Sequence, residues 1–222
     1  MRLRLAILLS VLFIGGCSNG VLQDYHGTEI DIDTQIIGIP LLLGSSGSSV
    51  PITKNLSLTA KHVASYDYSL VVAHHPDCDI SIIEKDNTGK QRHKMGVIYP
   101  EQKVKTFGKS FMNPLKTIYG EGVYKLDIQM KESMWHNRKC IISVLNSPIQ
   151  VGMSGGGVFN EKNELVGIIN AMGTSDTQLI ETGERLGRVS MMTSTNFLRQ
   201  WINKVVDQYN RDKGIESDNF IH

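Results

Sequence analysis

The stretch "VGMSGGGVFNEKNELVG", residues 151–167, places a serine among glycines directly before an apolar run. A serine hydroxyl is a weak nucleophile at neutral pH. Ser154 can therefore act only with a base that takes its proton and a partner that orients the base. The glycines allow the sharp backbone bends that bring amide N–H groups to one point. The stretch fits either a nucleophile or a simple glycine-rich turn, and the rest of the chain must decide between them.

A suitable base and acid precede the serine. Most of the seven histidines lie in polar, turn-like surroundings, but His62 stands in "LSLTAKHVAS", where an apolar strand ends and a turn begins. Asp79 follows in "CDISIIEKD", at the start of an aliphatic strand. A carboxylate there would fix the tautomer of the histidine ring and stabilise its cation. The order along the chain is histidine, acid, serine.

These motifs resemble the trypsin-like (chymotrypsin-fold) serine proteases, and the segments around them resemble the bacterial periplasmic HtrA type. "TAKH" is similar to the signature at the family's general base, and "GMSGGG" to its Gly-x-Ser-Gly-Gly. The resemblance implies a catalytic triad of His62, Asp79 and Ser154. It also implies an oxyanion hole made by the backbone amides of Gly152 and Ser154. It covers roughly residues 35–205 and leaves too few residues for a following PDZ-like region.

The same string also matches the Gly-x-Ser-x-Gly elbow of α/β-hydrolases. That fold needs an acid and then a histidine after the serine. The only histidine after Ser154 is His222, the last residue, and the expected alternation of strands and helices is missing. The chain order therefore argues against a hydrolase elbow.

Two features depart from the trypsin-like pattern. His62 and Asp79 are only 17 residues apart (79 − 62), which predicts a trimmed first barrel or a different acid. The alternative acids are Asp67, Asp77 and Asp86.

The second departure is Met153, which stands where digestive proteases of this family have an aspartate that pairs with a newly cut N-terminal amine. Methionine cannot form that ion pair. The site therefore forms without such a cleavage, or another contact orders it.

The resemblance also locates a substrate pocket. Pro148, six residues before Ser154, would lie near its base, and Asn170, Ala171 and Met172 would form its far wall. None of these residues is charged, so we expect a preference for apolar or small side chains.

Composition narrows the partners. The chain has 222 residues, and 23 Lys and Arg oppose 22 Asp and Glu, for a net charge of +1. No strong electrostatic field attracts nucleic acid, so we expect a protein or peptide substrate and no nucleic-acid partner.

The adjacent pair His74 and His75 would point to opposite faces of a strand, so we expect no metal site and no cofactor. The oligomeric state stays open.

The N-terminal residues have the pattern of a secretory signal. Residues 1–16 combine a basic start with a short apolar run and small residues, and the run is too short for a stable membrane span. The ending "IGGC" resembles the lipobox of bacterial lipoproteins, which implies that Cys17 becomes the first mature residue and carries lipid, including palmitate. Ser18 follows it rather than an aspartate. The resemblance thus favours an outer-membrane anchor on the periplasmic side, against an ordinary signal peptide with a chance cysteine.

The two other cysteines, Cys78 and Cys140, are either a disulfide in the oxidising envelope or two buried thiols. Residues 17–33 are polar and mixed, and are interpreted as a tether. From residue 195 apolar side chains recur at helical spacing, with Ser194 or Thr195 as the expected N-cap.

Many short apolar strands separated by turns predict an all-β protein. With the resemblance, this means two antiparallel six-stranded barrels followed by a C-terminal helix, and the short interval between His62 and Asp79 allows for a trimmed first barrel. We assign residues 34–205 to the protease domain, with its two barrels divided near 100–110. Residues 206–222 are the end of the helix and a polar tail.

The function predicted is a lipid-anchored serine endopeptidase that works through an acyl-enzyme. The alternative is a weakly active or inactive protease-fold binding module in the periplasm.

Overall fold

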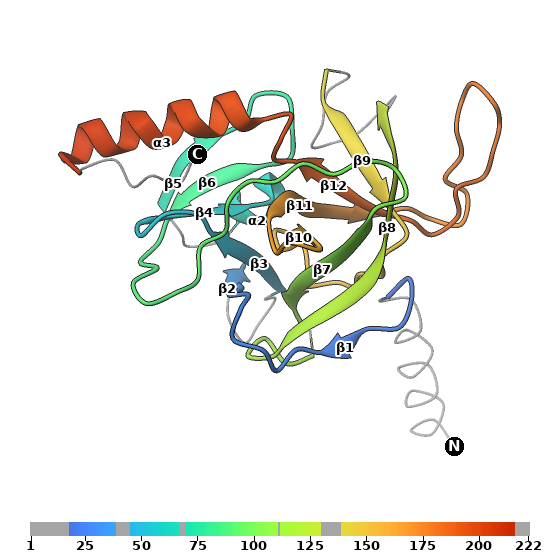
Figure 1. Ribbon diagram of the computed structural model, residues 1–222, viewed down its shortest axis with the longest axis horizontal. Helices are drawn as coiled ribbons and strands as arrows, with labels where there is room; N and C mark the ends of the chain where they lie inside the picture. Colours follow the sequence, from blue (N-terminus) through green and yellow to red (C-terminus); the bar gives the residue numbers. More distant parts are fainter. Residues whose placement is uncertain (1–17, 39–44, 67–69, 111, 130–138, 216–222) are drawn as a thin grey trace.

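The computed structural model describes residues 18–38, 45–66, 70–110, 112–129 and 139–215. Its strands form two antiparallel sheets that lie side by side, and the C-terminal helix packs at one end (Figure 1). This is the all-β architecture with a final helix that the sequence predicts. The signal peptide and Cys17 fall outside the described residues.

The first sheet contains five strands in the order β2-β3-β4-β6-β5. Their bounds are Asp33–Ile37 (β2), Ser45–Pro51 (β3), Leu56–Thr59 (β4), Leu70–His74 (β5) and Ser81–Glu84 (β6). The short helix α2, Lys61–Ala64, connects β4 to β5 and carries His62. Within residues 18–38, 45–66 and 70–110, this sheet has one strand fewer than the predicted six, which agrees with the trimmed first barrel that the 17-residue interval between His62 and Asp79 indicates.

The second sheet closes into a six-stranded barrel because β8 pairs with both β7 and β9. A short seventh strand, β1, adds to the outside of β8. The bounds are Gln23–Asp24 (β1), Lys103–Lys109 (β7), Thr117–Gln129 (β8), Ile141–Leu145 (β9), Gly157–Asn160 (β10), Leu165–Met172 (β11) and Ser190–Ser194 (β12).

The hairpin between β10 and β11 follows directly after the serine turn. Asn163 adopts a left-handed conformation with φ of 58°, and the side-chain oxygen of Asn160 accepts hydrogen bonds from the amides of Lys162 and Glu164, each at 3.0 Å. Asparagine tolerates the left-handed conformation, as Asn163 does here, and its side-chain oxygen can accept hydrogen bonds in a turn, as that of Asn160 does. The two asparagines therefore build the hairpin that the sequence predicts here.

Apolar side chains fill the inside of the second barrel and the space between the two sheets. One cluster joins Leu58 and Ile82 of the first sheet to Phe107 and Phe159 of the second. A second cluster, which includes Val158 and Met153, fills the closed barrel. The serine turn, which connects β9 to β10 of the second sheet, lies against β3 of the first.

The C-terminal helix α3, Arg199–Lys213, begins later than the sequence predicts. Thr195 is fully buried, and its amide and hydroxyl bond to the carbonyls of Val166 and Leu165. Those bonds extend the strand region past Ser194, so the first helical turn cannot form there. Within the described residues, no helix is both long and apolar enough to cross a membrane.

The predicted tether also differs from the structure. Residues 18–33 lie against the body, because Ile30 and Ile32 are each 5% exposed in the main core and Tyr25 packs edge-on to Phe107 at 5.0 Å. The reason is a period-2 alternation, "IDID", that places both isoleucines on one face.

Candidate active site

His62 and Asp79 are in direct contact. The ring Nδ1 of His62 lies 2.7 Å from Asp79 Oδ2, and the backbone amide of His62 donates to Asp79 Oδ1 at 2.9 Å. The Asp79 side chain is 2% exposed and that of His62 is 24% exposed. A buried carboxylate thus holds both the ring and the backbone of the histidine.

Asn170 on β11 connects the acid to the serine. Its side-chain amide donates to the backbone oxygen of Asp79 at 2.5 Å and to Asp79 Oδ2 at 3.3 Å. Its own backbone oxygen accepts a hydrogen bond from Ser154 Oγ at 3.3 Å. Thr193 on β12 donates to Asn170 Oδ1 at 2.7 Å and fixes the orientation of the amide. One residue therefore touches two of the three predicted triad members.

The turn that carries Ser154 lies against the segment that precedes His62. Gly155 has φ of 85°, and a Cβ at this position would clash with Ser48 O and Thr59 Oγ1 and lie 3.0 Å from the Ala60 amide. Only glycine combines this backbone conformation with so close an approach. The glycine after the serine therefore brings the turn onto the first sheet.

Ser48 on β3 binds this turn at several points. Its amide donates to Ser154 O at 2.7 Å and its hydroxyl to Gly152 O at 2.8 Å, while its own backbone oxygen accepts from Thr59 Oγ1 at 2.7 Å. The hydroxyl also accepts from the amide of Lys109 at 2.8 Å. Ser48 thus joins the serine turn to both sheets.

The amides predicted for an oxyanion hole are available. Gly152 has φ of 95°, and Met153 O accepts a hydrogen bond from the Gly156 amide at 2.8 Å. Because a trans peptide points its N–H opposite to its C=O, the amide of Ser154 faces away from that bond. Across the described part of the chain, neither Gly152 nor Ser154 donates its amide to another protein group.

Of the alternative acids, only Asp77 and Asp86 are among the described residues, and the structure shows each of them in a hydrogen bond with a residue other than His62. Asp86 accepts a hydrogen bond from the amide of Thr88 at 2.9 Å in an exposed turn. Asp77 lies in the loop before Asp79, and its amide donates to His75 Nδ1 at 3.1 Å. Asp67 lies outside the described residues.

The four predicted pocket residues differ in exposure and in the direction of their side chains. Ala171 is exposed and Met172 is partly buried against the barrel core. Pro148 is half-buried, and its backbone oxygen accepts from Thr106 Oγ1 at 2.8 Å. The side chain of Asn170 turns inward to Asp79, so only its backbone faces Ser154. Whether these residues bind a substrate side chain stays a prediction.

Two contacts hold the loop in front of Asp79. Cys78 is bonded to Cys140, which precedes β9, so a disulfide ties this loop to the second barrel. The ring Nδ1 of His75 accepts hydrogen bonds from the amides of Asp77 and Cys78 at 3.1 and 3.0 Å. Burial lowers the pKa of His75 below its usual value, which favours the neutral ring that can accept these bonds.

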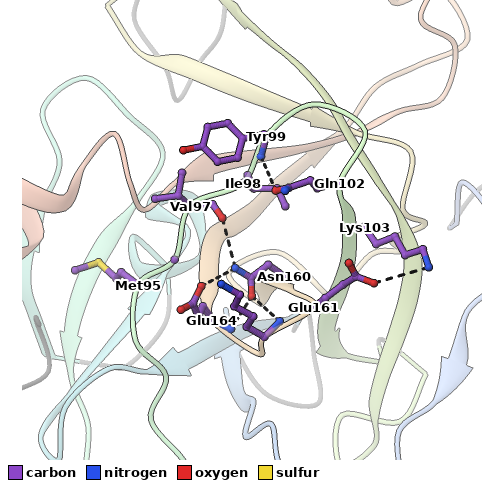
Figure 2. A pocket seen from close by; sticks show the side chains of 11 residues that line it. Met95, Val97, Ile98, Tyr99, Gln102, Lys103, Asn160, Glu161 and Glu164 are labelled. Atoms are coloured by element: carbon purple, nitrogen blue, oxygen red, sulfur yellow. Dashed lines mark hydrogen bonds and ion pairs between the residues drawn. The ribbon is translucent and has the colours of Figure 1, made fainter.

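A separate groove of about 350 Å³ lies between residues 95–103 and the β10–β11 hairpin, and Figure 2 shows the side chains that line it. Its polar groups bond to one another: Asn160 donates to Glu164 at 2.7 Å and to Val97 O at 3.4 Å, and Lys103 lies 3.8 Å from Glu161. Its lining includes none of the three predicted triad residues. This groove is therefore distinct from the candidate active site.

No protein-family model and no curated protein matches the sequence. Solved structures do match the fold. The HtrA-type protease AlgW with tripeptide aligns with a TM-score of 0.61 at 16% identity, over 85% of this chain and 62% of that one. The active form of the Rv3671c protease from M. tuberculosis aligns with a TM-score of 0.61 at 12% identity, over 80% of this chain and 82% of that one.

The chain has the HtrA-type protease fold. This confirms the architecture implied by the motifs around His62, Asp79 and Ser154. The chain spans less than two thirds of the AlgW chain. At sequence identities this low, the similarity shows a shared fold and nothing more.

Three supporting residues of this protease fold are not evident from the sequence. Ser48 begins the expected strand "SSVPIT" and Thr193 ends the expected strand "GRVSMMT", and neither position indicates a contact with the site. The resemblance predicts that Asn170 lines the pocket. Nothing in the sequence indicates that its side chain points to Asp79 instead. Only the pairing of distant strands brings these groups to the site.

Proposed function

We propose that this protein is a serine endopeptidase in which Ser154 is the nucleophile, His62 the general base and Asp79 the residue that orients the base. The observation that carries the proposal is the two-point contact of buried Asp79 with His62, at 2.7 Å to the ring and 2.9 Å to the amide. It is supported by Asn170, which contacts both Asp79 and Ser154.

In the proposed reaction, Ser154 Oγ attacks the carbonyl carbon of the substrate and its proton passes to Nε2 of His62. The negative charge that develops on the carbonyl oxygen is stabilised by the amides of Gly152 and Ser154. His62 then gives the proton to the leaving amine, and an ester on Ser154 remains. Water, deprotonated by His62, hydrolyses this ester and restores the hydroxyl.

The uncharged residues predicted for the pocket support a preference for apolar or small side chains at the cleaved position. Pro148 and Met172 carry no charge that would hold a substrate Arg or Lys. A peptide-library digest measures this preference directly. A dominant basic preference would contradict it.

We further propose that lipid on Cys17 anchors the protein in the outer membrane, on the periplasmic side. The "IGGC" ending and the absence of an aspartate at position 18 support this. Metabolic labelling with a palmitate analogue should mark the wild-type chain and not Cys17→Ala. Equal labelling of both would contradict the anchor.

The triad is tested with a fluorophosphonate probe, which needs no known substrate. We expect covalent labelling of Ser154, no labelling of Ser154→Ala, and a rate reduced by roughly 10³-fold or more in His62→Ala and in Asp79→Asn. Asp86→Asn is the matched control, because Asp86 lies in an exposed turn away from His62. A folded wild-type protein that never labels would favour the binding module, and unchanged labelling of His62→Ala would refute the mechanism.

A further inference from the structure

The first described residues lie on the loop that leads to Ser154. Residues 146–152 form this loop, which we call the nucleophile loop. Ser18 pairs with Gln150 in an antiparallel bridge, and the amide of Asn19 donates to Ile149 O at 3.2 Å. Gly20 approaches Pro148 so closely that a Cβ on it would lie 2.8 Å from the Pro148 Cβ. An N-terminal segment more than a hundred residues away in sequence thus covers one side of the nucleophile loop.

The side chain of Asn19 makes three further hydrogen bonds. Its Oδ1 accepts from the amide of Ile149 at 2.6 Å, and its Nδ2 donates to Arg188 O at 3.2 Å and to Ser190 Oγ at 3.0 Å. The Ser190 hydroxyl in turn donates to Ser147 O at 2.5 Å. Both backbone groups of Ile149 are therefore held by Asn19, and the loop is joined through the same amide to the start of β12.

These contacts reach the serine through two residues. Ile149 is 3% exposed and packs in the same barrel cluster as Met153, which is fully buried. The oxygen of Gln150 accepts from the amide of Met153 at 3.1 Å, and the Gln150 amide lies 3.3 Å from Met153 Sδ. Met153 directly precedes Ser154, so the position of Ile149 sets the course of the backbone that presents the Gly152 and Ser154 amides.

We propose that Asn19 is a positioning residue that orders the nucleophile loop and thereby the two oxyanion-hole amides. The proposal rests on the proposed serine endopeptidase. It answers the question raised by Met153, which cannot form an ion pair with an N-terminal amine. In this protein the neutral side-chain amide of Asn19, which lies on the N-terminal segment, binds the nucleophile loop through its Oδ1, and its Nδ2 binds residues 188 and 190.

The chemistry requires both halves of the amide. An aspartate keeps an acceptor for the Ile149 amide but has no N–H for Arg188 O and Ser190 Oγ. Each neutral hydrogen bond changes an equilibrium by about a factor of five. We therefore expect the maximal rate of labelling of Ser154 to fall about 10- to 100-fold in Asn19→Ala. Asn19→Asp, which loses the two bonds donated by Nδ2, should label at a rate between that variant and the wild type.

The experiment measures two quantities on the full chain. The first is fluorophosphonate labelling of Ser154 over a range of probe concentrations, which separates the maximal rate from the half-saturating concentration. The second is hydrogen–deuterium exchange of residues 146–153. The control variant is Gln23→Ala, which lies on the same N-terminal segment but loses only the exposed hydrogen bond with Tyr119.

In Asn19→Ala and Asn19→Asp we expect faster exchange of residues 146–153 and a lower maximal labelling rate, with little change in the half-saturating concentration. Gln23→Ala should resemble the wild type in both. Unchanged exchange in the Asn19 variants would overturn the proposal, as would faster exchange with an unchanged maximal rate. If the wild type itself does not label, the endopeptidase proposal fails, and the exchange data still decide whether Asn19 orders the loop.

Discussion

Removal of the Cys78–Cys140 disulfide should destabilise the fold by an amount that follows from the chain it closes. The bond joins residues 62 apart in sequence, so loop-closure entropy gives about 14 cal/mol/K, or about 4 kcal/mol at 25 °C. Both cysteines are buried, at 3% and 1% exposure, and Cys78 stands directly before Asp79. The bond therefore restrains the unfolded chain and holds the segment that carries Asp79 in the native one.

The variant Cys78→Ala/Cys140→Ala is compared with the wild type by urea unfolding, with and without a thiol reductant. With a slope of about 2 kcal/mol/M, the loss of about 4 kcal/mol lowers the midpoint by about 2 M urea. The reduced wild type should shift in the same direction, and the double variant should not respond to reductant. Because Asp79 is released, fluorophosphonate labelling of Ser154 should also slow under conditions where the protein stays folded.

A wild-type midpoint that is the same with and without reductant, in protein whose thiols are shown to be free, would refute this reasoning. Unchanged labelling in the folded double variant would refute the link to Asp79 and leave the stability argument intact.

Two more predictions concern the groups around Asp79. Asn170→Ala removes the amide that donates to Asp79 and should slow Ser154 labelling by about 10- to 100-fold, because a hydrogen bond to a charged group contributes about 1.5–3 kcal/mol; an unchanged rate in the folded variant would contradict it. His75 has a pKa lowered below 6.5 mainly by burial, with Lys61 also lowering it and Asp77 raising it. Its contribution to stability is thus present above pH 6.5 and lost as the pH falls below that value. In His75→Asn, which keeps an acceptor for the amides of Asp77 and Cys78 but does not titrate, the unfolding temperature should fall less steeply between pH 7 and 5. The same slope in variant and wild type would contradict this role.

Local chemistry in the sequence was enough to predict the fold and the three candidate triad residues. The "TAKH", "CDIS" and "GMSGGG" motifs each depend on residues that are adjacent in the chain, and their order alone argues against the hydrolase elbow. The short interval between His62 and Asp79 likewise predicts the smaller first sheet, since 17 residues leave little room for additional strands.

The contacts around the three candidate triad residues depend on strand pairings that cannot be predicted from local sequence patterns. Asn170 turns toward Asp79 rather than into a pocket because Thr193, on the neighbouring strand, binds its side-chain oxygen. Asn19 looks like part of a polar tether, yet it reaches Ile149 because β1 pairs with β8 and brings the N-terminal segment across the barrel. The disulfide was equally open, because spacing along a chain gives no distance between two thiols.

The sequence by itself determined which residues are candidates for nucleophile, base and acid, because these capacities depend on residue type and immediate context. Only the tertiary structure decided what holds them in place. Support from Ser48, Asn170 and Asn19 comes through hydrogen bonds between segments far apart in the chain, and such bonds exist only after the strands have paired and the two sheets have packed.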